Sequence, residues 1–316
     1  MLFILKHFTS SIKTAITLSK DKKFSLFLKI FNTRFFYAFP AIREFFSPKT
    51  KLLKNIKKSF FFKNKISSAK LFNDLSELGY NNELFIKKNI LNKIKNEITL
   101  KNSIIDFKSN QKKKLDYFKS LKPNASLKSI LLISKKKKIA HVALDIDLKK
   151  TKFIKKLITS ELITNIAKQY LGSKEVHMFG KCYISNPVKT TVLKKKDNAQ
   201  YFHYDNDFKK FFRIFIYLTD VTKEAGPHSF VATTHKYKKI SHILAERIDD
   251  REIKKTYSPE KIKVFCGEKG QVILEDTFGL HKGVVPTKIS RIMLILYFAL
   301  DSGFDMYRYP LVKKLS

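Results

Sequence analysis

The sequence predicts an α+β protein that is mainly β, in which helices pack outside a sheet sandwich or barrel. Apolar residues before Gly172 recur at three- and four-residue steps, as in amphipathic helices, whereas those after Gly172 alternate, as in strands. Glycine and proline separate the alternating segments, which indicates turns. The chain has 316 residues, 44% of them hydrophobic, enough for one large core and an accessory segment.

Residues 1–70 form a basic, Phe-rich segment that differs from residues 71–316, which we expect to form one domain. The segment holds 16 Lys and Arg against two acidic residues, a net charge of +14, and 13 of the 29 Phe. Helical spacing in it predicts one apolar face, made of Phe24, Phe27, Leu28, Phe31 and Phe35. Such a face usually packs on the rest of the protein or on a second subunit, but a basic helix with an aromatic face can also lie in a membrane interface.

Three helices are predicted between residues 71 and 172. Gly79 ends the first helix, and the segment ELFIKKNILNKIKNEI forms the second. Residues 101–140 are rich in Lys and Ser, so we expect a loop-rich stretch there. The segment FIKKLITSELITNIAKQYLG, residues 153–172, predicts one amphipathic helix that ends at Gly172.

Five segments after Gly172 are predicted strands, because apolar residues alternate in them and turn residues flank them. They are VHMFGKCYIS, RIFIYLTDV, KVFCG, GQVILEDT and RIMLILYFAL.

The net charge of +37 comes almost entirely from Lys, since only 7 of the 64 basic residues are Arg. Nucleic-acid readers use Arg for bidentate contacts, so we do not expect a nucleic-acid partner, whereas an anionic membrane surface is a candidate partner of residues 1–70. No cleavage pattern follows the first apolar run, and no window approaches the about 18 apolar residues of a spanning helix. We expect a cytoplasmic protein, peripheral at the membrane through residues 1–70, with Cys182 and Cys266 as buried thiols.

The segment QYFHYD places His203 and Asp205 two residues apart, and on a strand such residues share one face. His281 follows the predicted strand GQVILEDT, and Arg291 opens the apolar run RIMLILYFAL. A guanidinium beside so apolar a run is costly unless an anion meets it. Two His and one carboxylate are the facial ligand set of Fe(II), which leaves positions open for a 2-oxo acid and O2, while an Arg can hold the distal carboxylate of that acid.

From about residue 71 to residue 309 the chain resembles the phytanoyl-CoA dioxygenase family of Fe(II)/2-oxoglutarate-dependent oxygenases. QYFHYD is similar to the Gln-x-aromatic-His-x-Asp segment of that family, and EKGQVILEDTFGLHKG is similar to the strand with its distal His. FRIFIYLTDVTKEAGPHSFVATTHK is similar to its strand, Leu-Thr-Asp-Val turn, Gly-Pro and Ser/Thr-His-Lys. The resemblance implies a double-stranded β-helix core (jelly-roll, cupin-like) with flanking helices.

Carried over residue by residue, the resemblance implies that His203, Asp205 and His281 bind Fe(II). It also implies that Arg291 grips the distal carboxylate of 2-oxoglutarate, with O2 as the second co-substrate. The expected activity is that of a dioxygenase that hydroxylates an unactivated C–H bond of a small-molecule or lipid-like substrate. Asp205 favours hydroxylation, because related halogenases have a small residue at that position.

Tyr217 lies on the strand that walls the co-substrate in this family, and Tyr183 is a candidate hydroxyl donor to it. The sequence departs from the family pattern at VATTHK, where Pro-Gly-Ser-His is usual, and at Gly283, where some members have a hydroxyl residue.

Two other functions are weighed against this one. A non-catalytic basic membrane- or nucleic-acid-binding protein on a jelly-roll scaffold would not need the full set of ligands and Arg291. A nucleic-acid demethylase typically carries further Arg after that position, and RIMLILYFAL has none.

Four further polar residues near the motifs are expected to lie outside the site. We expect His228 to be exposed, Asp207 to be solvated, His235 to be structural and Asp276 to be a turn residue or an acid behind the metal ligands.

Overall fold

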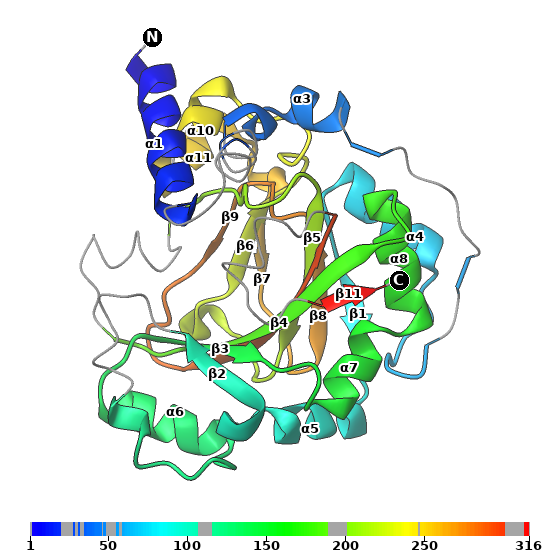
Figure 1. Cartoon of the computed structure of the whole chain (residues 1–316), viewed down its shortest axis with the longest axis vertical. Coiled ribbons are helices and arrows are strands. Elements are labelled where there is room, and N and C mark those ends of the chain that lie inside the picture. The colour runs from blue at the N-terminus through cyan, green and yellow to red at the C-terminus, as the bar shows by residue number, and fades with distance from the viewer. Residues whose placement is uncertain are drawn as a thin grey trace.

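The computed structural model describes residues 2–19, 28, 31, 35–45, 47–48, 55–56, 59–106, 116–188, 201–245, 247–300 and 313–315. Within them, two antiparallel sheets form the centre of the protein, and helices lie around them (Figure 1). In the part of the chain so described, no helix has the length and apolar content needed to cross a membrane.

The larger sheet has eight strands. β11 (Lys313–Leu315) pairs with β4, outside the main strand order. The other seven follow one another across the sheet as β1 (Tyr80–Phe85), β8 (Gln271–Glu275), β5 (Phe211–Tyr217), β10 (Arg291–Ala299), β4 (Val176–Ser185), β3 (His141–Ile146) and β2 (Ser103–Asp106).

The smaller sheet has three strands, in the order β7 (Ile262–Phe265), β6 (His228–Val231) and β9 (His281–Gly283). An aromatic-rich core, which includes Phe215 of the larger sheet and Phe230 and Phe265 of the smaller, fills the space between the two sheets. This pair of facing sheets confirms the predicted α+β, mainly β fold with a jelly-roll core and flanking helices.

Helices cover the outer face of the larger sheet, on the right and at the bottom of Figure 1. They are α4 (Ser68–Glu77), α5 (Lys88–Glu97), α6 (Leu127–Lys136), α7 (Lys152–Ile158) and α8 (Glu161–Leu171). The short 3-10 helices are η2 (Leu100–Asn102), η4 (Lys223–Ala225) and η5 (Pro259–Lys261). A second group of helices lies at the top of Figure 1, and it comprises α1 (Leu2–Ser19), η1 (Phe36–Ala38), α3 (Pro40–Phe45), α10 (Ile240–Leu244) and α11 (Asp250–Thr256).

Alternation along the strands of the larger sheet separates two cores. In β4, Cys182 and Ile184 belong to the core under the helices, whereas Phe179 faces the smaller sheet, with Tyr183 packed beside it. Polar side chains on this inner face therefore point into the space between the sheets, where they can form a site.

Three sequence expectations about local structure were wrong. The segment ELFIKKNILNKIKNEI begins in strand β1, because these residues pair with β8 at the sheet edge. It becomes helical only at α5. The described part of residues 101–140 contains β2 and α6, two elements that were not predicted, and residues 107–115 lie outside the described residues. The predicted helix over 153–172 is two helices, α7 and α8, which break at Thr159 and Ser160, although Gly172 does end the second with a left-handed φ of 69°.

The N-terminal segment contacts the rest of the protein through described residues. Helix α1 contacts α10, whereas the Phe31 and Phe35 rings pack against Phe8 of α1, within residues 1–70. Phe24 and Phe27 lie outside the described residues. Of the two cysteines, Cys182 is buried as expected, but Cys266 is exposed.

Candidate metal centre

His203, Asp205 and His281 meet between the two sheets. His203 and His281 exchange backbone hydrogen bonds, with N–O distances of 3.0 and 2.8 Å, and their ring centroids lie 4.4 Å apart. The Asp205 N–H donates to the Thr277 carbonyl at 2.8 Å, which fixes the segment after His203 beside the β8–β9 connection. One ligand atom from each of the three side chains lies within 4.8 Å of the others.

The same kind of hydrogen bond orients both imidazoles. His203 Nδ1 lies 3.0 Å from the Tyr201 carbonyl, and His281 Nδ1 lies 3.0 Å from the Gly279 carbonyl. A carbonyl only accepts, so each Nδ1 carries the proton and each Nε2 presents a lone pair. This is how metal-ligating histidines are usually held.

Burial favours the ligand form of each side chain. Burial lowers the pKa of His281 to about 4 and that of His203 well below its usual value, so both rings are neutral at pH 7. Burial alone would raise the pKa of Asp205, but the Arg213 guanidinium, followed by His281 and His203, outweighs it and holds this pKa below its usual value. The site thus offers two neutral nitrogens and one ionised oxygen.

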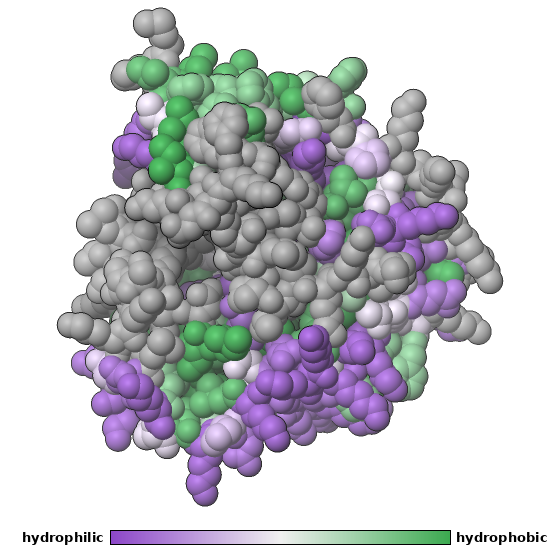
Figure 2. Space-filling model, viewed as in Figure 1, coloured by the Kyte–Doolittle hydropathy of each residue, from purple (hydrophilic) through white to green (hydrophobic). Residues whose placement is uncertain are grey.

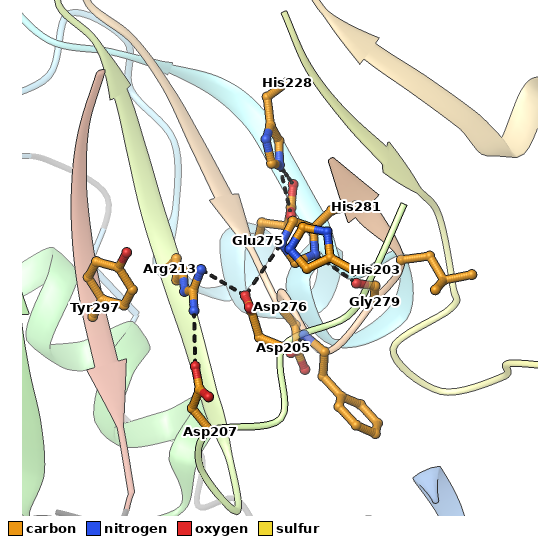
Figure 3. A network of polar contacts seen from close by, with 12 residues as sticks. His203, Asp205, Asp207, Arg213, His228, Glu275, Asp276, Gly279, His281 and Tyr297 are labelled. Atoms are coloured by element: carbon orange, nitrogen blue, oxygen red, sulfur yellow. Dashed lines mark hydrogen bonds and ion pairs between the residues drawn. The ribbon is translucent and has the colours of Figure 1, made fainter. Parts of the chain in front are cut away.

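Arg213 is a residue of the site that the sequence motifs did not reveal. It lies on β5, and its Nη1 is 2.7 Å from Asp205 Oδ2, while its Nη2 is 3.9 Å from Asp207 Oδ2 (Figure 3). Its Cζ lies 4.5 Å from the ring centroid of Tyr297 on the neighbouring strand β10. The expectation that Asp207 is solvated was wrong: Asp207 is buried beside this guanidinium, which stabilises its charge.

Further polar side chains share the inner face of the larger sheet. Arg213 on β5 pairs in register with Tyr297 on β10 and with Glu275 on β8, so it lies between these two residues. On β3 and β4, the buried Lys181 Nζ lies 2.8 Å from Asp145 Oδ1.

Arg291 lies at the start of β10, buried and close to Tyr217. Burial lowers its pKa, and Nη1 has no hydrogen-bond partner among the residues that the structure describes. Its Nη2 reaches Gly283, where a Cβ would come within 3.2 Å. The departure from the family pattern at Gly283 thus leaves room for this guanidinium.

The two predicted tyrosines occupy different places. The Tyr217 hydroxyl donates to the Phe265 carbonyl at 2.7 Å and lies 3.3 Å from the His228 N–H. The Tyr183 hydroxyl lies 3.2 Å from that of Tyr297. The structure therefore places Tyr217 near Arg291 and Tyr183 on the side of Arg213.

The expectation that His228 is exposed was wrong. It is buried, its Nε2 lies 2.9 and 3.0 Å from the two Glu275 carboxylate oxygens, and its ring centroid is 5.6 Å from that of His281 (Figure 3). Burial lowers the pKa of His228 to about 3 and raises that of Glu275 well above its usual value, so the proton of this pair resides on the carboxyl group. Two uncharged groups thus share a hydrogen bond beside the three ligands.

His235 and Asp276 have structural roles, as expected. His235 Nε2 lies 2.9 Å from the Ser76 carbonyl. Asp276 accepts hydrogen bonds from the Tyr170 hydroxyl at 2.6 Å and from the Phe278 N–H at 2.9 Å, so it ties the turn after β8 to α8.

The donor set suits a divalent metal that takes nitrogen and oxygen ligands, with its other positions free. The partnerless Arg291 nitrogen suits a carboxylate beside that metal. The residues therefore fit Fe(II) and a dicarboxylic 2-oxo acid.

Comparison with known proteins agrees with this chemistry. The family model of phytanoyl-CoA dioxygenase (PhyH) matches residues 106–283, a range that includes all three candidate ligands. No curated protein matches the chain.

Several solved structures are similar. The non-heme alpha ketoglutarate dependent epimerase SnoN from nogalamycin biosynthesis is 12% identical, over 73% of this chain and 80% of that chain, with a TM-score of 0.43. AviO1 from Streptomyces viridochromogenes Tue57 is 11% identical, over 76% and 98%, with a TM-score of 0.44. HygX from Streptomyces hygroscopicus, solved with nickel, 2-oxoglutarate and hygromycin B, is 11% identical, over 73% and 86%, with a TM-score of 0.41.

Proposed function

This chain belongs to the phytanoyl-CoA dioxygenase family, and from that membership we propose that it hydroxylates an unactivated C–H bond of a small molecule, using Fe(II), 2-oxoglutarate and O2. The observation that carries the proposal is the meeting of His203, Asp205 and His281, whose ligand atoms lie within 4.8 Å of one another.

The three ligands would hold Fe(II) through the two Nε2 atoms and one carboxylate oxygen of Asp205. Arg291 would receive the distal carboxylate of 2-oxoglutarate, and its buried, partnerless Nη1 supports this role. Tyr217 would wall the co-substrate with its ring, since its hydroxyl is already engaged by the Phe265 carbonyl. Tyr183 lies on the side of Arg213, which supports a contact to substrate better than a contact to 2-oxoglutarate.

When bound, the iron and 2-oxoglutarate supply the oxidation: one oxygen atom of O2 enters succinate, formed together with CO2, and the other enters the substrate as a hydroxyl. The residues of this chain keep the ligands deprotonated, orient them and exclude water, because all three lie between the packed sheets. Asp205 supplies the oxygen ligand, and this supports hydroxylation over halogenation.

Polar groups on the inner face support a substrate with hydroxyl or charged groups. Lys181, Asp145, Tyr183 and Tyr297 are inner-face residues of the strands β3, β4 and β10, on the Arg213 side of the three ligands. A polar small molecule, or the polar part of a lipid, would suit this polar face better than a bare hydrocarbon chain.

Anaerobic titration with Fe(II) and 2-oxoglutarate tests the proposal. We expect a weak visible charge-transfer band that needs both additions, is lost in His203→Ala, and needs about 10- to 100-fold more 2-oxoglutarate in Arg291→Ala. Arg251→Ala, an exposed residue of α11, is the matched control and should behave as wild type. A folded protein that takes up no metal would instead support the non-catalytic binding protein. Turnover of 2-oxoglutarate to succinate without a substrate hydroxyl would support an oxygenase but not a hydroxylase.

A further inference from the structure

Helix α1 leaves several apolar side chains exposed, although part of it is buried. Ser11 and Ala15 are buried against the protein, whereas Ile4, Leu5, Phe8 and Ile16 are between 38% and 58% exposed. At about 100° per residue, these exposed apolar positions fall in one stripe about 120° wide, which also contains the buried Ala15. Lys6 and Lys13 follow along the far edge of the stripe, and both are exposed. A helix that served only to cover the protein would not need to leave four apolar side chains exposed.

Other exposed apolar residues lie at the same end of the molecule. Phe36 of η1 and Phe45 of α3 are 44% and 81% exposed, and Tyr237 and Ile240, at the start of α10, are 76% and 66% exposed. Helix α10 contacts α1, and Figure 2 shows hydrophobic residues gathered along the top of the molecule, where Figure 1 places α1 and α3. Single exposed apolar residues are common, but a gathered group marks an interaction surface.

The charge of this region selects the partner. Helix α1 carries Lys6 and Lys13 and no acidic residue, and residues 1–70 as a whole carry a net charge of +14. An apolar stripe edged by Lys is the pattern of a helix that lies in a membrane interface, with its apolar side chains among the acyl chains and its ammonium groups at anionic headgroups.

We propose that α1 and the exposed aromatic residues of η1 and α3 dock this protein on an anionic lipid surface. The apolar stripe inserts at the level of the headgroups, and the Lys side chains reach the phosphates. The protein does not cross the bilayer, since the helix lies along the surface. This docking is independent of the chemistry at the metal centre.

A second copy of the chain fits the face less well. In a two-fold dimer the same patch meets itself, which would bring Lys6 and Lys13 of one copy toward those of the other. No acidic residue of α1 would offset this repulsion. Nucleic acid would meet the Lys residues but would leave the apolar stripe in water.

Vesicle co-sedimentation of the full chain tests the proposal. Phosphatidylcholine vesicles with and without phosphatidylglycerol are compared, and a run without vesicles corrects for aggregation. The test variant is Ile4→Ser/Leu5→Ser/Ile16→Ser. The matched control is Leu132→Ser/Val264→Ser/Ile289→Ser, which removes three similarly exposed apolar residues from other surfaces.

We expect wild type and control to bind the phosphatidylglycerol vesicles and the α1 variant to bind about tenfold or more weakly. Lys6→Glu/Lys13→Glu should also weaken binding, and added salt should weaken the wild type. Equal vesicle binding by the α1 variant and the control would overturn the proposal. The absence of vesicle binding by wild type would also overturn the proposal. This holds whether or not light scattering shows a wild-type dimer that the α1 substitutions dissociate.

Discussion

The Arg213 guanidinium forms an ion pair with Asp205, with 2.7 Å between Nη1 and Oδ2. Asp205 itself lies on a segment outside the sheet, whereas Arg213 is part of the central strand β5. The sheet thereby orients a carboxylate that a segment outside it carries. Arg213 thereby fixes the geometry of the oxygen ligand and favours metal binding, while its positive charge lowers the basicity of that ligand and offsets part of this gain.

Replacing Arg213 should therefore weaken metal binding without removing a ligand. We expect Arg213→Met to raise the Kd for Fe(II) by about 10- to 100-fold, the usual effect of losing a group that orients a metal ligand. Arg213→Lys keeps the charge but not the fork of donors, and should recover part of the loss. Anaerobic titration with Fe(II), or with Co(II) as a spectroscopic probe, measures this. An unchanged Kd in a folded Arg213→Met protein would mean that Asp205 is oriented by its backbone alone.

Gly283 should influence 2-oxoglutarate rather than the metal. A Cβ at this position would come within 3.2 Å of Arg291 Nη2, so the guanidinium must shift by a few tenths of an ångström. We expect Gly283→Ala to raise the KM for 2-oxoglutarate by about three- to tenfold, with the Fe(II) affinity unchanged. Gly180→Ala is the control, because its Cβ would meet Ile146 at an ordinary 3.4 Å. Equal loss of metal and 2-oxoglutarate binding in Gly283→Ala would point to a general disturbance of β9.

Acid should destabilise the metal-free protein through its buried histidines. His281 has a pKa of about 4 when folded and about 6.5 when unfolded, so between these values the unfolded chain binds a proton that the folded chain does not. The free energy of unfolding therefore rises with pH across this window and falls on acidification, and His203 and His228 act in the same direction. Glu275 acts in the opposite direction, because its folded pKa is raised and its contribution is lost as pH rises.

Two variants separate these contributions. His281→Gln should make the pH dependence shallower by up to about 1.4 kcal/mol per pH unit between pH 4 and 6.5. Glu275→Gln should make it steeper above pH 4.5, since it removes the opposing group. Urea unfolding of the EDTA-treated proteins at several pH values measures both slopes. Parallel curves for wild type and His281→Gln would show that His281 titrates near its ordinary value when folded.

Short motifs, together with the resemblance to a known family, pointed to the three metal-ligand candidates and Arg291. His281 and Arg291 do begin strands, but His203 and Asp205 lie outside the named strands, so the expectation that they share one face of a strand was wrong. Arg213 has the same kind of signal, because it is a charged residue within the apolar run FFRIFIY. On a strand it shares one face with Tyr217, four residues later. The sequence did not reveal that His228 contacts Glu275, because these two residues lie in different sheets and are 47 positions apart in the chain. Strand β1 was not predicted for a similar reason. Its pairing with β8 at the sheet edge outweighs the helical spacing of the apolar residues in this segment.

Arg43 should be needed for stability, because it joins the N-terminal segment to the residues that follow Asp205. Its Nη2 donates to Asn206 Oδ1 and to the Phe208 carbonyl, both at 2.9 Å, and its Cζ lies 3.7 Å from the Phe278 ring centroid. Arg43→Met would remove both hydrogen bonds and the guanidinium–ring contact from a buried position, so we expect the free energy of unfolding to fall by about 2–4 kcal/mol.

Lys70→Met is the control for Arg43→Met, because it removes exposed ion pairs to Asp74 and Glu83 and should cost less than about 1 kcal/mol. Urea unfolding of the metal-free proteins compares the two. If Arg43→Met also weakens Fe(II) binding, then Asn206 transmits the position of Arg43 to Asp205, its neighbour in sequence. If its urea midpoint equals that of wild type, the N-terminal segment does not stabilise the catalytic core, and residues 1–70 act on that core as a separable unit.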